Sequence, residues 1–208
     1  MGYGLGVKQW RCDSMIACPI ILLILKTMRV LVSNTQPRLL SLAAKTAVCH
    51  TITYFCMGIL AYHILNYAEM IARPCSGMRP MTDPLVRAAV LFQPLRGVLF
   101  ALVFYPFRER FFGRAHGWLL MGWMLIALGI LGTFAASPGS MEGLIYTTTP
   151  VWMQLRGLLE IVPQALLLSA LLCYWVNNPA KKWLTWLLSV VFILLMAVIV
   201  LGLFMPAR

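Results

Sequence analysis

The chain has 208 residues, of which 61% are hydrophobic and 11% charged, and 17 Lys and Arg against 6 Asp and Glu leave a formal net charge of +11. A soluble domain usually has about 25% charged residues, so this composition excludes an ordinary soluble domain and favours an all-α, polytopic membrane protein. The apolar runs are continuous, which disfavours a transmembrane β-barrel, and the sequence lacks the basic and aromatic pattern of a nucleic-acid-binding module.

The N-terminal segment contains one ambiguous apolar run, at 14–33. Lys26 and Arg29 interrupt this run, and Pro19 lies in its first half. It is either a sixth transmembrane helix, an interfacial helix or a signal-like segment. Met28 also offers an alternative start of the chain. We therefore expect a basic N-terminal segment at 1–43, followed by a single transmembrane helical domain at 44–208.

Five longer apolar runs are predicted to be transmembrane helices, because each approaches or exceeds the roughly 20 residues that cross a bilayer core of about 30 Å. Segments rich in Gly, Pro, Ser and charged residues separate them. The five predicted helices are 44–67, 84–107, 117–136, 151–176 and 183–204.

The distribution of Lys and Arg near the helix ends predicts the orientation, since these residues collect on the cytoplasmic side. Nine are expected there: Lys26, Arg29, Arg38, Lys45, Arg108, Arg110, Arg114, Lys181 and Lys182. Three are expected on the opposite side: Arg73, Arg79 and Arg208. This bias predicts a non-cytoplasmic C-terminus and an external 137–150 loop, in a membrane of the bacterial plasma (inner) membrane type.

A short motif repeats in two of the predicted helices. The sequence LRGVL at 95–99 recurs as LRGLL at 155–159, and a glutamine (Gln93, Gln154) precedes each copy. Two crossings separate the copies, so both helices would run in the same direction, as in the parallel repeats of some transporters. Chance similarity in a chain rich in Leu and Gly explains the match equally well.

The same two helices hold the polar residues that are unusual for apolar segments. A charged side chain near the centre of a bilayer costs at least about 2.5–3.5 kcal/mol, so such residues usually face the bundle interior and mark functional sites. At 1.5 Å per residue, Arg96 and Glu160 lie about 18 and 15 Å from the outer helix ends. We therefore expect Arg96 to contact Glu160. The candidate ligand-binding residues are Gln93, Arg96, Arg156, Glu160, Gln164 and, from the external loop, Glu142.

Two further features favour a ligand at this spot. Pro94 and Pro163 each remove a helical hydrogen bond, and the carbonyl freed one turn earlier needs another partner. Arg156 and Arg96 together outnumber Glu160, which leaves about one uncompensated positive charge. An anionic small molecule, a lipid headgroup or Glu142 would balance it.

The other groups of residues with regular spacing do not predict a cofactor. Cys49, Cys56 and His63 have heptad spacing, but they span about 21 Å along a helix, too far for one metal ion. No metal, haem or disulfide is expected. Two stripes of small residues predict close helix contacts: Gly122, Gly129 and Ala136 on one helix, and Ala165, Ser169 and Cys173 on another.

The polar residues favour a protein that binds or transports an anionic or polar small solute, with no catalytic residues assigned. One alternative is a non-catalytic membrane subunit or scaffold in which the cluster only fixes helix packing. Another is a lipid-modifying enzyme with Glu160 as acid or base. The expected partners are the lipid bilayer and either further copies of the chain or a partner subunit.

Overall fold

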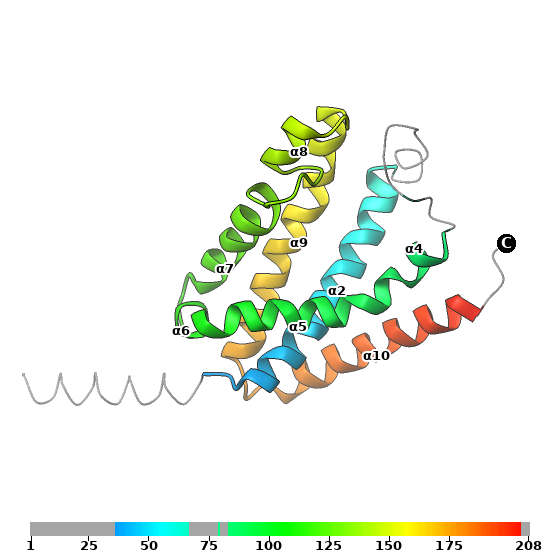
Figure 1. Cartoon of the computed structure of the whole chain (residues 1–208). Helices are drawn as coiled ribbons and strands as arrows, with labels where there is room; N and C mark the ends of the chain where they lie inside the picture. The colour runs from blue at the N-terminus through cyan, green and yellow to red at the C-terminus, as the bar shows by residue number, and fades with distance from the viewer. Residues whose placement is uncertain (1–35, 67–78, 80–82, 205–208) are drawn as a thin grey trace, which may run out of the picture. The chain divides into compact units, whose positions relative to one another are not determined.

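The computed structural model describes residues 36–66, 79 and 83–204 of the chain, and the regular elements within them are all helical (Figure 1). The predicted all-α class is confirmed. The helices belong to one compact unit, Pro37–Arg208. The ambiguous run at 14–33 and the alternative start at Met28 lie outside the described residues. In chain order the elements are α2 (Leu39–Ile64), α4 (Pro84–Ala88), η2 (Ala89–Phe92), α5 (Gln93–Phe104), η3 (Tyr105–Phe107), α6 (Arg108–Phe111), α7 (Gly117–Ile126), the π-helical segment η4 (Ala127–Leu131), α8 (Met141–Tyr146), α9 (Val151–Asn177) and α10 (Lys182–Phe204).

Four of the described helical stretches are long and apolar enough to cross a membrane. They have 26, 28, 27 and 22 residues. Each is longer than the roughly 20 residues that a bilayer core of about 30 Å requires. The four stretches are Leu39–Ile64, Pro84–Phe111, Val151–Asn177 and Lys182–Leu203.

The remaining predicted helix, 117–136, is shorter than expected. Helix α7 and the segment η4 together cover Gly117–Leu131, about 22 Å at most. The apolar run continues beyond this point, but the chain leaves the helix at Gly132, and the Thr133 hydroxyl donates to the Ala135 carbonyl at 2.9 Å. Hydropathy alone therefore placed the end of this helix too far along the chain, because it counted the apolar residues of a turn.

The second span is a continuous stretch of short α and 3₁₀ segments. Its start is capped by Asp83, whose Oδ1 accepts the Leu85 N–H at 2.8 Å and whose Oδ2 bonds to Arg79 at 2.9 Å. The hydrogen bond from Arg79, together with that from Leu85, lowers the pKa of Asp83 below its ordinary value. A carboxylate at this position suits the N-terminal end of a helix.

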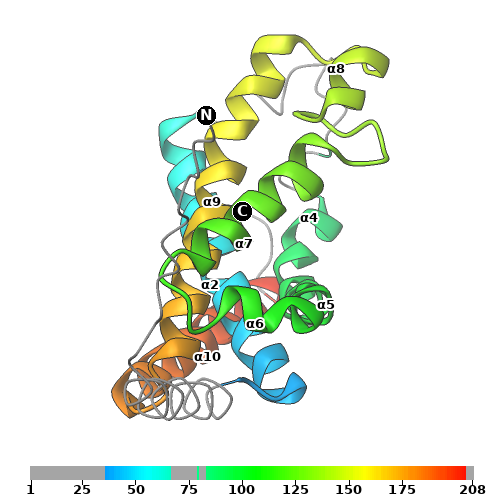
Figure 2. The same ribbon diagram turned by 90° about the vertical axis from the view of Figure 1, so that its left-hand side faces the viewer.

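Helix α2 packs against both α5 and α9, while α7 packs against α9. In Figure 1 α5 runs across the view, and in Figure 2 it is seen nearly along its axis, whereas α9 runs from top to bottom in both. The axes of α5 and α9 are therefore steeply inclined to each other, so the two helices do not form the predicted parallel pair. The buried apolar cluster includes Leu42, Cys49, Ala101, Phe104, Phe111, Met121, Leu172 and Trp175.

Helix α2 carries buried small polar residues that are satisfied within the helix. The hydroxyl groups of Thr46, Thr51 and Thr53 are buried and donate to carbonyl groups one turn earlier, at 2.8, 2.8 and 2.9 Å. Because these bonds stay inside α2, the threonines act as small side chains, and beside Thr46 the backbone of α2 closely approaches Gly97 of α5.

Of the predicted small-residue stripe on the 117–136 helix, one contact is confirmed and one is wrong. A Cβ atom built at Gly122 would lie 2.9 Å from the Ser169 hydroxyl oxygen, so α7 and α9 approach closely there. A Cβ at Gly129 would meet no described atom within 4 Å. Gly129 belongs to the π-helical segment and faces open space.

Candidate functional site

A cavity of about 380 Å³ lies where α2, α5, α7 with η4, and α9 meet the 132–140 loop. This volume is within the range of about 300–1,000 Å³ that is usual for small-molecule sites. Most of its wall is apolar or aromatic, and a few polar groups face it. The polar lining residues are His50, Tyr54, Arg96, Ser137, Glu160 and Gln164.

Three of the predicted site residues line this cavity: Arg96 from α5, and Glu160 and Gln164 from α9. Gln93 does not line the cavity, but its side chain is hydrogen-bonded to His50, which does. The direct Arg96–Glu160 contact stays a prediction.

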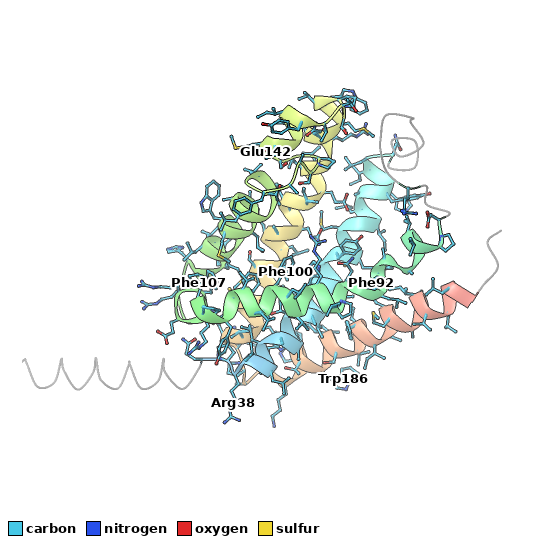
Figure 3. All side chains as sticks on the ribbon, in the orientation of Figure 1. Arg38, Phe92, Phe100, Phe107, Glu142 and Trp186 are labelled. Atoms are coloured by element: carbon cyan, nitrogen blue, oxygen red, sulfur yellow. The ribbon has the colours of Figure 1, made fainter. Side chains whose placement is uncertain are left out.

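Two predicted site residues are not among those that line the cavity, Arg156 and Glu142. Arg156 lies one turn before Glu160 on α9, and the residues of α9 that line the cavity begin at Glu160. Glu142 is exposed in the first turn of α8, apart from Phe100 at the centre of Figure 3. The predicted excess of positive charge at the site therefore does not hold for the lining residues.

His50 was not predicted as part of the site. Its hydrogen bond to Gln93 determines which ring nitrogen carries the proton. Its Nε2 lies 3.0 Å from Oε1 of Gln93, while the amide nitrogen of Gln93 donates to the Ala89 carbonyl at 3.2 Å. Because that second bond orients the Gln93 amide, Oε1 accepts and His50 Nε2 carries the proton. In the neutral ring, Nδ1 is then an acceptor. This buried Nδ1 has no hydrogen-bond partner among the described residues.

Pro94 explains why Gln93 is available to hold His50. Pro94 has no N–H to donate to the Val90 carbonyl, and the backbone N–H of Gln93 donates to that carbonyl instead, as in a 3₁₀ turn. The Gln93 side chain then reaches the Ala89 carbonyl. The protein itself thus satisfies the carbonyl freed by this proline.

Phe100 forms the aromatic centre of the site (Figure 3). The Arg96 guanidinium carbon lies 5.5 Å from the centroid of its ring, and the His50 ring meets it edge to face at 5.0 Å. Tyr54, one turn after His50 on α2, lies 6.2 Å from the His50 ring. A cation over an aromatic face is held by the ring quadrupole, so Phe100 orients Arg96 at the cavity wall.

The π-helical segment brings another part of the wall into place. The Gly132 N–H donates to the Ala127 carbonyl at 2.8 Å, a bond that spans five residues. Gly129 and Ile130 within this segment line the cavity. Single π-helical turns often occur at functional sites, and nothing in the amino-acid pattern of 127–131 predicted this one.

The loop before α8 supplies Ser137 and Pro138 to the wall, and Gln154 holds this loop in place. Gln154 is 2% exposed, and its Oε1 accepts the Gly139 N–H at 3.1 Å. Its amide nitrogen donates to the carbonyl groups of Thr149 at 2.8 Å and Gly143 at 3.3 Å, and to the Thr147 hydroxyl at 3.3 Å. In the sequence Gln154 stood out only as the counterpart of Gln93 before the second copy of the repeat. The sequence therefore did not predict that the Gln154 side chain holds this loop.

The fold and the site together define a class: an all-helical protein with four helices suited to crossing a membrane and a polar cavity among them. Within the described residues, no three His, Cys, Asp or Glu side chains are grouped so that they could hold a metal ion. Comparisons with protein-family models, with curated proteins and with solved structures found no match.

Proposed function

We propose that this protein spans a membrane and that its cavity binds a small anionic or polar solute, which it carries across the bilayer. The observation that supports the proposal most strongly is the presence of Arg96 and Glu160 at a 380 Å³ cavity among apolar helices. Ionisable groups in such surroundings are costly and usually mark a solute or ion pathway. The cavity volume lies within the usual range for small-molecule sites, which suits a small solute.

The described contacts support a common side for the basic residues. The Gly113 N–H donates to the Asn177 side chain at 2.8 Å, and the Lys45 ammonium lies 5.4 Å from the centroid of the Trp175 ring. These contacts bring together the start of α2, the turn after α6 and the end of α9. We propose that this end faces the cytoplasm of a bacterial cell and that the C-terminus lies outside the plasma membrane. A periplasm-dependent reporter fused after Arg208 should then be active.

Substitution of Arg96 tests the binding site. Full-length protein in non-ionic detergent would be titrated with lactate, succinate, inorganic phosphate and glycerol, and the unfolding temperature recorded. A solute that binds raises this temperature, because it stabilises the folded state only. We expect Arg96→Gln to weaken the binding of that solute at least tenfold, since a charge-assisted hydrogen bond contributes about 1.5–3 kcal/mol.

Arg156→Gln is the matched control, because it removes the same charge from a residue of α9 that does not line the cavity. It should leave binding unchanged. Equal losses in both variants would show that the arginines act through net charge and not through the cavity. The double variant Arg96→Leu/Glu160→Leu separates the scaffold alternative: a scaffold keeps its function with this apolar pair, whereas a solute site folds and loses its ligand.

A further inference from the structure

We infer that the solute is a small zwitterion with an apolar body, of the amino-acid class; this rests on the proposed solute site and names its ligand. The first step is the charge of the lining. Among the described residues that line the cavity, Arg96 and Glu160 carry the formal charges, one of each sign. Arg156, which made the predicted site cationic, is not one of them.

The second step is the cost of leaving either charge unmatched. A simple anion would match Arg96 but would bring a like charge to Glu160, and a simple cation would do the reverse. In surroundings of low dielectric constant, an uncompensated charge is strongly unfavourable. A ligand that carries both charges can bind Arg96 through its carboxylate and Glu160 through its ammonium group, so each side chain replaces the interaction it had without the ligand by one with the ligand. Among charged ligands, the zwitterion is therefore the one whose binding leaves the charge of the site balanced.

The third step is the rest of the wall, which is apolar. Five aliphatic side chains and the Phe100 ring line the cavity in addition to the polar groups. An apolar body of the ligand would be removed from water against them, which contributes about 25 cal/mol for each Å² buried. Sugars and inorganic ions lack such a body. The aliphatic lining residues are Leu125, Ile130, Ile161, Ala165 and Leu168.

The test compares leucine with two analogues that each lack one charge: 4-methylpentanoate, without the ammonium group, and 3-methylbutylamine, without the carboxylate. Binding to the full-length protein in non-ionic detergent would be measured by titration calorimetry. We expect leucine to bind at least tenfold more tightly than either analogue. Glycerophosphoethanolamine is included because a lipid headgroup could supply the same zwitterion. If it binds more tightly than leucine, a free amino acid is the wrong source.

Single substitutions of Glu160 and of Arg96 should each remove the preference for leucine over a different analogue. In Glu160→Gln the preference for leucine over 4-methylpentanoate should disappear, and in Arg96→Gln the preference over 3-methylbutylamine should disappear. Arg96→Lys keeps the charge and should keep both preferences. Arg156→Gln and Glu142→Gln are matched controls that should bind as the wild type does. Elution profile and unfolding temperature identify any variant that fails to fold, and in that case the wild-type comparison of leucine with its two analogues decides.

The outcomes distinguish this inference from the proposed solute site. Equal binding of leucine and 4-methylpentanoate to the wild type would overturn the zwitterion and leave a simple anion site. Binding of lactate or phosphate, with no binding of leucine at 10 times the concentration that saturates them, would do the same. If no probe of either series binds, both the inference and the solute site fail.

Discussion

Replacing Gly97 by alanine is expected to lower the unfolding temperature of the protein by roughly 2–8 °C, since a net loss of about 1–2 kcal/mol is expected and about 1 kcal/mol shifts the midpoint of a domain of this size by about 2–4 °C. A Cβ atom at Gly97 would lie 2.5 Å from the Ala47 Cα, 2.9 Å from the Ala47 nitrogen and 3.0 Å from the Thr46 carbonyl oxygen. All three are backbone atoms of α2. They cannot turn away as a side chain can, so α2 and α5 would have to move apart.

Two opposing terms decide the sign of the effect. Alanine is a better helix former than glycine by about 1 kcal/mol, which favours the variant. Overpacking of a close contact usually costs about 1–3 kcal/mol and occasionally more, and here rigid backbone makes up the contact. The destabilising term is therefore larger. The same displacement would separate His50 from Gln93, so ligand binding at the cavity should weaken as well.

The short repeat provides the control for this prediction. Gly157 occupies the position in the second copy that Gly97 occupies in the first, and a Cβ there would meet no described atom within 4 Å. Gly157→Ala should leave the unfolding temperature unchanged or raise it slightly. Unfolding can be followed by intrinsic fluorescence in the same detergent for both variants. Equal effects of the two substitutions would show that helix propensity, and not the α2–α5 contact, decides the result.

Replacing Gln154 by leucine should release the loop that closes the cavity beside Ser137. The substitution removes every hydrogen bond of the Gln154 side chain, and it leaves the Gly139 N–H and the Thr149 carbonyl without this partner. The Gly139 N–H is buried and the Thr149 carbonyl is half-buried. A buried polar group left unpaired costs about 1–3 kcal/mol, so the loss of these two bonds corresponds to about a tenfold change in an opening equilibrium, since about 1.4 kcal/mol is a factor of ten.

Hydrogen–deuterium exchange of peptides within 137–149 measures this opening directly. Exchange should become about tenfold faster in Gln154→Leu, since about 1.4 kcal/mol corresponds to a factor of ten in the opening equilibrium. Gln164→Leu is the matched control, because it makes the same substitution on the same helix at a residue that lines the cavity from another side. It should weaken ligand binding without changing exchange in the loop. Unchanged exchange in Gln154→Leu would show that other contacts hold the loop.

The helical class and most of the helices were predictable because they follow from local properties of the chain. Long apolar runs without period-two alternation form helices whatever their partners, and α9 at Val151–Asn177 matches the predicted 151–176 closely. The first helix begins at Leu39 instead of 44. The largest error, the end of the 117–136 helix, arose because a turn rich in apolar residues has the same hydropathy as a helix.

The site was predictable only in part. Arg96, Glu160 and Gln164 stood out because polar side chains are costly in apolar helices, and the structure places all three at one cavity. His50 did not stand out, because a histidine that satisfies one ring nitrogen within a helix bundle has no distinctive sequence pattern. The inclusion of Arg156 depended on the assumption of parallel helices, which periodicity cannot test.

Composition and hydropathy thus determined that the described part of this chain is helical, that four of its helices are long and apolar enough to cross a membrane, and which residues are chemically unusual within them. Tertiary structure alone decided which of these residues meet. The reason is that α2 packs against both α5 and α9, which are steeply inclined to each other, and that Gly97 of α5 closely approaches Ala47 of α2. In this arrangement His50 and Tyr54 of α2 line the cavity and Arg156 does not. This arrangement thereby changes the charge of the site from positive to balanced.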